Sequence, residues 1–200
     1  MQRARPLPTD ADETLMLRYA QGEIAAFDML YSRHNLCVWR YVFRSVRVQA
    51  VADDLLQDVW FAVARQASSY VPTARFKTWL FTMAHHRMVD YFRTHKNHVS
   101  LDMGTEGDTS DSGPAPLVNT LAADSGFGPV RQLESREQAR ALLDAIDQLP
   151  QVQREAFLLQ AEAGMNVETI AATCGVSFET AKSRLRYAKS SLRQHLQAFA

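Results

Sequence analysis

The sequence predicts an all-α protein with two helical domains joined by a flexible acidic linker, the C-terminal domain carrying a helix-turn-helix. Apolar residues recur at helical spacing in both halves of the chain. No stretch combines alternating apolar and polar residues with the turn signals of a hairpin. Five of the eight glycines lie between residues 104 and 129. We therefore expect domains at residues 10–96 and 131–200, with the linker at residues 97–130.

Composition narrows the class of protein further. The chain has 200 residues, enough for one or two domains, and 46% of them are hydrophobic, which excludes a wholly disordered chain. The longest apolar run, residues 59–64, is far shorter than the roughly 18 residues of a spanning helix, and residues 1–9 contain no secretory apolar segment. We expect a cytoplasmic protein that does not insert into a membrane. Cys37 and Cys174 stand in no paired motif, so neither a disulfide framework nor a cysteine zinc site is expected.

Three helices are expected in the N-terminal domain, each from a stripe of apolar residues at helical spacing. The first stripe follows Gly22 and contains Ile24, Phe27, Leu30 and Tyr31. The second follows Asp53-Asp54 and contains Leu55, Leu56, Val59, Trp60 and Val63. The third contains Trp79, Leu80, Met83, Met88, Tyr91 and Phe92.

The linker is identified by its composition. Residues 104–129 hold most of the glycines, three of the seven prolines and many Asp, Ser and Thr residues. Residues 96–130 carry five acidic side chains against one basic side chain. Such a segment buries too little apolar area to offset the entropy lost on ordering, so we expect it to be flexible.

The C-terminal domain begins with an apolar stripe at Ala139, Leu142, Leu143 and Ile146, which breaks at Leu149-Pro150. Residues 167–189 then follow the pattern of a helix-turn-helix. In this pattern Ile170 faces inward, Gly175 adopts a positive φ in the turn, and Ser177 caps the second helix.

The second helix of this motif has an apolar side, Ala181, Leu185, Ala188, Leu192 and Leu196, opposite Glu179, Lys182, Ser183, Arg186 and Arg193. A major-groove reader requires this division, because an apolar back holds the helix while the front offers donors to phosphates and base edges. A bundle helix with solvated charges is the alternative, and the helix-turn-helix spacing favours DNA binding. The candidate DNA-binding residues are Ser177, Glu179, Thr180, Lys182, Ser183, Arg184 and Arg186.

Several ordered motifs together resemble bacterial sigma factors of the extracytoplasmic-function group. They are residues 53–60 (Asp-Asp-Leu-Leu-Gln-Asp-Val-Trp), residues 76–84 (Phe-Lys-Thr-Trp-Leu-Phe-Thr-Met-Ala), residues 90–93 (Asp-Tyr-Phe-Arg) and residues 149–155 (Leu-Pro-Gln-Val-Gln-Arg-Glu). The resemblance covers nearly the whole chain. It implies a promoter-melting domain (region 2), a linker that threads the polymerase cleft, and a −35-binding domain (region 4). The function implied is that of an initiation subunit that brings core RNA polymerase to promoters.

In such proteins the helix that carries residues 53–60 docks on the clamp helices of the largest polymerase subunit. The candidate polymerase-binding residues are Asp53, Asp54, Gln57, Asp58 and Trp60, with Gln57 and Asp58 foremost and Leu55 and Val59 expected in the core. An acidic cluster also suits a helix N-terminus electrostatically, which would account for Asp53 and Asp54 but not for Asp58, one turn further on.

The resemblance also implies that the loop at residues 68–75 captures a flipped −10 base. The candidate −10 residues are Ser69, Tyr70, Arg75, Lys77, His86, Arg87 and Arg93. Strand opening needs cations for the backbone and a pocket or aromatic face for the unstacked base. Tyr70 either stacks on the base or packs under the loop, whereas Trp79 is expected in the core. The family often has Asn where His86 stands, so a base contact at that position is open.

No catalytic constellation, cofactor site or metal site is expected. His85, His86, His95 and His98 cluster in sequence, but His86 and Asp90 lack a third ligand on a common face. Expected partners are core RNA polymerase, promoter DNA and an anti-sigma factor. The alternative function is a two-domain helix-turn-helix regulator that acts without being a polymerase subunit, and an enzyme is disfavoured.

Overall fold

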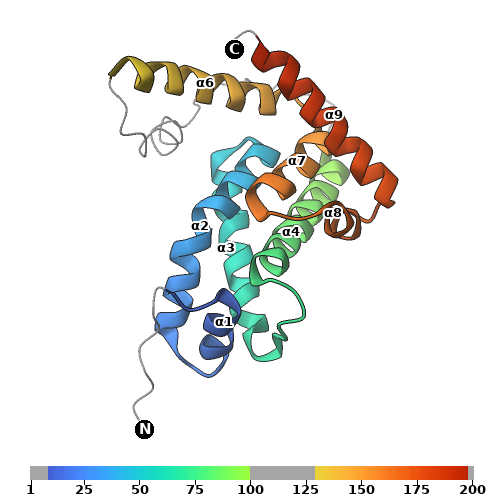
Figure 1. The fold of residues 1–200 in the computed structure, drawn as a ribbon. Coiled ribbons are helices and arrows are strands. Elements are labelled where there is room, and N and C mark those ends of the chain that lie inside the picture. Colours follow the sequence, from blue (N-terminus) through green and yellow to red (C-terminus); the bar gives the residue numbers. More distant parts are fainter. Residues whose placement is uncertain (1–8, 100–128, 198–200) are drawn as a thin grey trace.

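The structure is a computed structural model that describes residues 9–99 and 129–197, and within these ranges it is helical and contains no strand. The N-terminal domain comprises α1 (Asp12–Ala20), α2 (Ile24–Val46), α3 (Gln49–Gln66), the 3-10 turn η1 (Ala67–Ser69) and α4 (Phe76–Val99). The C-terminal domain comprises α6 (Pro129–Asp147), α7 (Gln151–Ala163), α8 (Val167–Cys174) and α9 (Phe178–Leu196) (Figure 1). The all-α prediction is confirmed. Helices α4 and α6 extend into the range expected for the linker, whose residues 100–128 lie outside the described residues.

Helices α2, α3 and α4 form the core of the N-terminal domain (Figure 1). Their facing sides bury Val38 and Val42 of α2, Val59 and Val63 of α3, and Leu80, Phe81 and Ala84 of α4. Leu55 and Val59 are buried, as their expected core positions require, and Trp79 is half-buried against the same core. The apolar stripes read from the sequence are therefore the faces that the helices bury.

Helix α1 was not predicted, because it buries only Leu15 and Met16 and is too short to show a periodic stripe. Its ends are fixed by contacts with later elements. The carboxylate of Glu13 accepts a hydrogen bond of 2.6 Å from the backbone nitrogen of Phe76, the first residue of α4. An acidic side chain at a helix N-terminus satisfies an orphan donor and opposes the helix dipole. Helix α1 thereby fixes where α4 begins.

A buried ion pair joins α1 to α2. Nε2 of His34 lies 2.7 Å from Oδ2 of Asp12, and Nη1 of Arg33 donates to Oδ1 of the same carboxylate at 2.6 Å. Burial by itself lowers the pKa of His34, but the hydrogen bonds and charges of Asp12 and Cys37 together outweigh it and raise the pKa to about 9. Burial likewise raises the pKa of Asp12, and the hydrogen bonds and charges of His34 and Arg33 together outweigh it, so that the pKa is lowered. Both shifts favour the charged pair.

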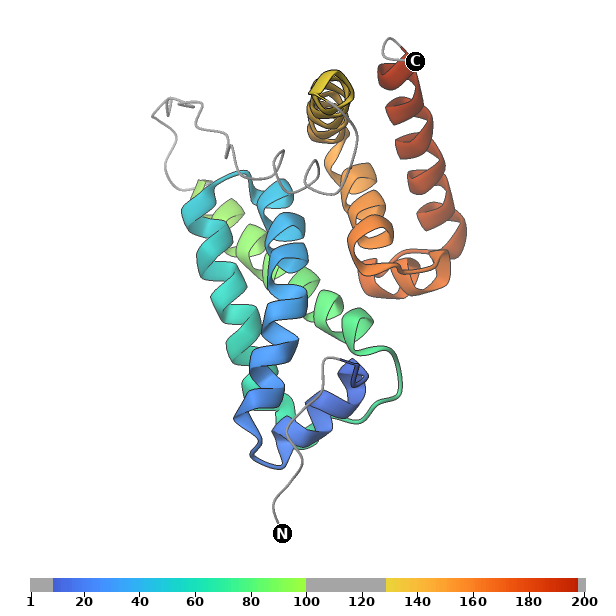
Figure 2. The ribbon, with the colours of Figure 1, turned by 60° about the vertical axis from the view of Figure 1, so that its left-hand side comes forward.

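The C-terminal domain packs against the N-terminal domain through α7 and α8, which contact α2 and α4 (Figure 2). The buried apolar residues of the two domains belong to one cluster, and several polar contacts cross the boundary. Arg44 of α2 is buried and donates to the carboxylate of Asp147 at 2.7 Å, and Arg40 pairs with Glu162 at 3.0 Å. The hydroxyls of Thr82 and Thr173 lie 3.4 Å apart across the same boundary. Hydrogen bonds and ion pairs thus contribute to holding the two domains together.

The Asp12–His34 pair predicts a specific dependence of stability on pH. The pKa of His34 in the folded protein is about 9, above its ordinary 6.5, so the contribution of the pair is complete below pH 6.5 and is lost as the pH rises through 9. His34→Gln removes this titration. Between pH 6.5 and pH 9 we expect the stability advantage of the wild type over His34→Gln to shrink by about 1–2 kcal/mol.

Urea denaturation of the two proteins across this pH range measures that difference. The matched control is His86→Gln, which replaces an exposed histidine and leaves the Asp12–His34 pair in place, so the pH dependence expected from that pair should remain in this variant. A pH-independent difference for His34→Gln would show that His34 does not carry the expected charge.

Candidate functional site

The largest described hollow on the N-terminal domain is a groove of about 730 Å³ between α1, α2 and α3, which we call the docking groove. Its lining residues are Tyr19, Phe27, Tyr31, Asp53, Asp54, Leu56, Gln57, Trp60, Phe61 and Ala64. Four of the five predicted polymerase-binding residues therefore line one surface. Asp58, the fifth, is exposed on α3 and is not among the lining residues.

The floor of the docking groove is aromatic. The ring of Phe27 lies 4.8 Å from that of Tyr19 and 5.6 Å from that of Trp60, and Tyr31 lies 5.0 Å from Trp60. Trp60 is buried within this cluster and is only 5% exposed. Such a floor offers a partner apolar contact area without large entropy loss on ordering.

The rim of the docking groove is acidic and polar. Asp53, Asp54 and Gln57 are exposed, and Asp53 accepts a hydrogen bond of 2.7 Å from the indole nitrogen of Trp39. Phe61 is 56% exposed, an unusual environment for a phenylalanine side chain. An aromatic floor with an acidic rim suits a partner segment that carries both apolar and basic side chains.

The sequence did not identify Tyr19, Tyr31 and Phe61 as part of this surface. Tyr31 was assigned to a core stripe by its spacing, and periodicity cannot distinguish a residue that lines a groove from one in a closed core. Tyr19 belongs to α1, which was not predicted. A signal was present at Phe61, because it lies beside the acidic residues of α3 rather than on the buried stripe.

The loop between η1 and α4 is exposed between two buried aromatic anchors. Tyr70 is 8% exposed at its start, and Phe76 is fully buried at its end. The residues between them, 71–75, are all exposed. Of the predicted −10 residues, Ser69 and Arg75 lie exposed at this loop, and Lys77 is half-buried at the start of α4.

Tyr70 packs under the loop in this structure. Its ring lies 5.0 Å from the ring of Trp79 and 6.3 Å from that of Phe76. Burial raises the pKa of its phenol to about 12, with the charges of Glu13 and Asp12 adding to the effect. Its hydroxyl has no hydrogen-bond partner among the described residues. Of the two roles considered for Tyr70, the structure places the ring in the supporting one.

The remaining predicted −10 residues are distributed around α4. At 100° per residue, His86 and Arg93 lie on nearly the opposite side of the helix from Lys77, and Arg87 lies closer to Lys77. His86 and Arg93 are exposed, and Arg87 is half-buried. Arg93 pairs with Asp90 at 2.9 Å and lines a cavity beside α7. These cations do not form one continuous track on α4.

The helix-turn-helix of α8 and α9 has the predicted local geometry. Gly175 follows α8 with a φ of 63°, a conformation that glycine adopts without a steric penalty. Ser177 caps α9, its hydroxyl accepting a hydrogen bond from the backbone nitrogen of Thr180 at 3.2 Å. Ala181, Leu185, Ala188 and Leu192 are buried, as predicted, and Leu196 is half-buried.

The exposed front of α9 is predominantly basic. Lys182, Arg186, Lys189 and Arg193 line a surface groove of about 460 Å³ next to Val167 and Gln160, which we call the basic groove. Arg186 lies over the ring of Tyr187 at 4.9 Å, and Lys182 lies 3.7 Å from Glu179. Both cations are exposed and available to a phosphate or a guanine edge.

Arg184 differs from the other predicted DNA-binding residues. It is half-buried and lines the cavity between the domains, together with His85 and Glu155. Ser183 and Thr180 lie on a neighbouring shallow groove, which Arg184 also borders. The sequence placed Arg184 with the others because they share one helix; the structure turns its side chain toward the N-terminal domain.

Among the described residues, no helix is both long enough and apolar enough to cross a membrane. Cys37 and Cys174 are both free thiols in the structure.

Comparison with known proteins identifies two matching families. A family model described as sigma-70 region 2 matches residues 30–98, and one described as sigma-70, region 4 matches residues 139–192. The RNA polymerase sigma factor CarQ of Myxococcus xanthus is 33% identical over 181 residues, which span 90% of this chain and 95% of that protein. The ECF RNA polymerase sigma factor SigK of Mycobacterium ulcerans is 27% identical and matches over 96% of this chain and 97% of SigK.

Solved structures share the fold. CnrH in complex with the cytosolic domain of CnrY has a TM-score of 0.59 and 24% identity, over 96% of this chain and 100% of that one. The sigma factor RpoE in complex with the anti-sigma factor NepR from Bartonella quintana has a TM-score of 0.63 and 22% identity, over 86% of this chain and 96% of that one.

The burial of Tyr70 predicts how it responds to substitution. Tyr70→Ala should lower the free energy of unfolding by about 3–5 kcal/mol, because it empties a packed aromatic site. Tyr70→Phe should leave stability within about 0.5 kcal/mol of the wild type, because the hydroxyl that it removes has no partner among the described residues. Urea denaturation tests both. Wild-type stability in Tyr70→Ala would mean that the ring is free to leave this site.

Proposed function

This chain belongs to the extracytoplasmic-function group of sigma-70 RNA polymerase sigma factors, and from that premise we propose which of its surfaces performs each step of initiation. A sigma factor binds core RNA polymerase and directs transcription from specific promoters. The family favours this function over a helix-turn-helix regulator that acts alone. Sigma factors are non-catalytic initiation factors, and we propose that this chain has no catalytic activity and acts in the cytoplasm, where polymerase and promoter DNA are.

The docking groove is the surface that we propose for core polymerase. The observation that carries the proposal is an exposed phenylalanine, Phe61, beside an aromatic floor and the carboxylates of Asp53 and Asp54. A polymerase helix with apolar and basic residues, such as a clamp helix of the largest subunit, would fill the floor and pair with the rim. Gln57 lies within the groove and Asp58 beside it, so Gln57 should contribute more of the binding energy.

The basic groove and the front of α9 are the surface that we propose for the −35 element. Ser177 and Thr180 fix the start of the helix, where its backbone nitrogens and Glu179 approach the DNA. Lys182 and Arg186 then offer charged donors along the front. Arg184 stands apart and is assigned a smaller share of DNA binding.

The exposed loop at residues 71–75 is the element that we propose for capture of the −10 base. Tyr70 and Phe76 hold its two ends, so the loop presents its backbone and Arg75 to the non-template strand without losing its shape. Lys77 and Arg87 then supply phosphate contacts on one side of α4.

An anti-sigma factor is a further partner that we propose. The solved relative RpoE is bound to the anti-sigma factor NepR, and CnrH is bound to the cytosolic domain of CnrY. A partner of this kind would cover the docking groove or the basic groove and so block initiation.

Runoff transcription tests the proposed function as a whole. Purified core polymerase is supplied with this protein and a promoter library, and transcripts that share −35 and −10 motifs are expected only when the protein is present. A folded protein that gives neither transcripts nor a complex with core polymerase would favour the alternative function, a helix-turn-helix regulator that acts without polymerase.

The docking groove yields a prediction about binding to core polymerase. Phe61→Ala should weaken binding to core polymerase at least about tenfold, because an exposed aromatic anchor loses its contact area. The double variant Gln57→Ala, Asp58→Ala should weaken it similarly, while Asp58→Ala alone has a smaller effect. Affinity is measured by titrating core polymerase with labelled protein. Leu36→Ala is the matched control, since Leu36 is 42% exposed on α2 and does not line the groove; an equal loss there would argue against this surface.

The basic groove yields a prediction about transcription. Arg186→Ala should reduce transcription from a selected promoter by about 5- to 150-fold, because it removes a charged donor to the DNA worth about 1–3 kcal/mol. Arg184→Ala should reduce it less, and both variants should bind core polymerase normally. Arg140→Ala, which removes an exposed arginine of α6, is the control. Equal effects of Arg184 and Arg186 would contradict the separation of their roles.

A further inference from the structure

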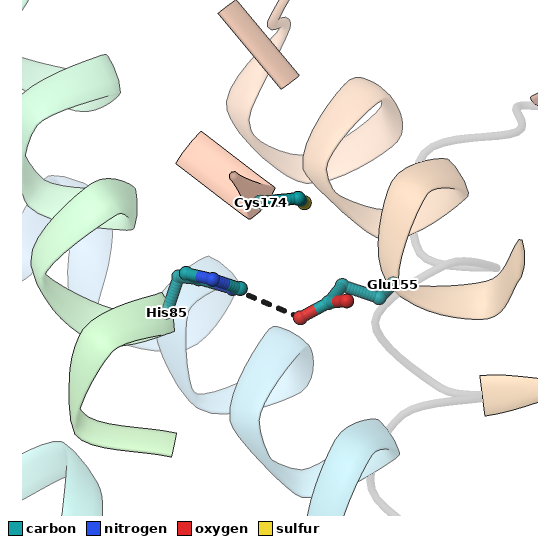
Figure 3. A group of neighbouring side chains, drawn as sticks. All are labelled: His85, Glu155 and Cys174. Atoms are coloured by element: carbon teal, nitrogen blue, oxygen red, sulfur yellow. Dashed lines mark ion pairs between the residues drawn. The ribbon is translucent and has the colours of Figure 1, made fainter. Parts of the chain in front are cut away.

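Three side chains with metal-ligating atoms converge where the two domains meet (Figure 3). His85 extends from α4 of the N-terminal domain, and Glu155 and Cys174 extend from α7 and α8 of the C-terminal domain. Their ligand atoms all lie within 4.8 Å of one another, and Nδ1 of His85 lies 2.9 Å from Oε1 of Glu155. This cluster could not be predicted from the sequence, because its members lie far apart in the chain.

The histidine of this cluster is buried, and its Nδ1 has no hydrogen-bond partner among the described residues. His85 is 6% exposed, and the contact of its Nδ1 with Oε1 of Glu155 at 2.9 Å is an ion pair only when the imidazole is protonated. The buried hydroxyl of Tyr41 is also without a partner in the described ranges, and burial, with the charges of Glu155 and Cys174, raises its pKa well above the ordinary value. A buried polar atom without a hydrogen bond lowers the stability of the protein. A ligand for Nδ1 would remove that cost.

We propose that His85, Glu155 and Cys174 bind a Zn²⁺-class divalent cation that joins the two domains. Imidazole nitrogen, carboxylate oxygen and thiolate are the three ligand types that zinc uses in proteins. Bonds of about 2.0–2.3 Å in a tetrahedral site place ligand atoms about 3.3–3.7 Å apart, so these atoms need to move by about 1 Å. The cavity of about 470 Å³ that His85, Glu155 and Cys174 line leaves room for water as the fourth ligand.

The charges at the site balance once the cation is bound. The thiol of Cys174 loses one proton to the solvent as its sulfur bonds to the metal, so two negative ligands neutralise the divalent charge. Burial and the charge of Glu155 together raise the pKa of this thiol to about 12, and Arg184 opposes the rise. Arg154 and Arg184, which line the same cavity, then face a neutral centre.

A cation at this position would hold the domains closed, since its ligands come from both. This consequence for transcription rests on the proposed function. The −35 and −10 elements lie about 25 base pairs apart, or about 85 Å along the duplex, whereas a compact chain of 200 residues is about 40 Å across. The closed arrangement cannot reach both elements at once. Bound zinc should therefore inhibit initiation.

Metal binding is tested on the full-length protein after treatment with a chelator. Titration with Zn²⁺ should show one ion per chain, and Co²⁺ in its place should give the charge-transfer absorption of a cobalt–thiolate bond. His85→Gln, Glu155→Gln and Cys174→Ser should each weaken Zn²⁺ binding by more than about 100-fold, because even outer-shell changes cost 10- to 100-fold. Cys174→Ser should also abolish the charge-transfer band.

Matched controls separate this site from adventitious binding. Cys37→Ser removes the other cysteine, and His86→Gln removes the histidine next to His85; both should bind Zn²⁺ like the wild type. The wild-type cobalt spectrum needs no variant, so a poorly folded mutant does not prevent the test. Absence of the thiolate band in the wild type, or Zn²⁺ binding that persists in Cys174→Ser, would overturn the proposal.

Closure is tested separately by small-angle scattering. Zn²⁺ should lower the radius of gyration of the wild type and should not change that of Cys174→Ser. Identical effects on both proteins would overturn the joining of the domains. In runoff transcription, Zn²⁺ should inhibit the wild type more than Cys174→Ser, and equal inhibition would overturn the regulatory consequence. If no sigma activity is found, one Zn²⁺ per chain with the thiolate band still supports the metal site, while the proposed function fails.

Discussion

The closed arrangement of this protein depends on a buried charge that finds its partner in the other domain. Arg44 of α2 is 6% exposed and donates to the carboxylate of Asp147, the last residue of α6. The backbone oxygen of Asp147 also accepts hydrogen bonds from Arg47 and Arg154. Three cations thus meet the negative end of one helix. A buried guanidinium left without that carboxylate would be strongly destabilising, so the domains stay together.

The ion pairs between the two domains also limit how firmly the domains are held together. Buried ion pairs return little more than the desolvation that they cost, and packed apolar surface would hold two domains more tightly. Burial and the charges of Arg47 and Arg44 lower the pKa of Arg154, and the charge of Asp147 opposes this shift, so the cations around Asp147 are not purely stabilising. An interface of this kind opens when a partner compensates for the lost contacts. Core polymerase and promoter DNA are such partners in the proposed function.

The surfaces proposed for first contact do not require opening. The rim of the docking groove and the front of α9 are exposed while the domains are closed. Arg184 and the His85–Glu155–Cys174 cluster are instead held at the boundary between the domains. Binding of polymerase and promoter DNA can therefore precede separation of the two domains. A ligand at the boundary between the domains acts only on their separation. This arrangement divides binding and regulation between different parts of the molecule.

Much of the fold followed from local sequence. Gly175 and Ser177 specify the turn and cap of the helix-turn-helix within a few residues, and the apolar back of α9 follows from a period of 3.6. The exposed face of α3 was predicted on the same ground. Helix α1 was missed because two buried residues do not establish a period. Only part of the docking groove could be predicted, because Tyr19 and Tyr31 line it from other helices.

Tertiary packing decided the rest. The sequence left Tyr70 with two roles, and the ring lies under the loop because Trp79 and Phe76 pack around it. From the sequence, Arg184 was grouped with the DNA-reading residues, whereas in the structure this side chain lines the cavity between the domains. No metal site was expected, because only histidines and Asp90, which lie close together in the sequence, were considered as ligands. Periodicity indicates which side of a helix is apolar, but it carries no information on which distant helix that side contacts. For this reason the helices and the family could be predicted from the sequence, and the His85–Glu155–Cys174 cluster between the domains could not.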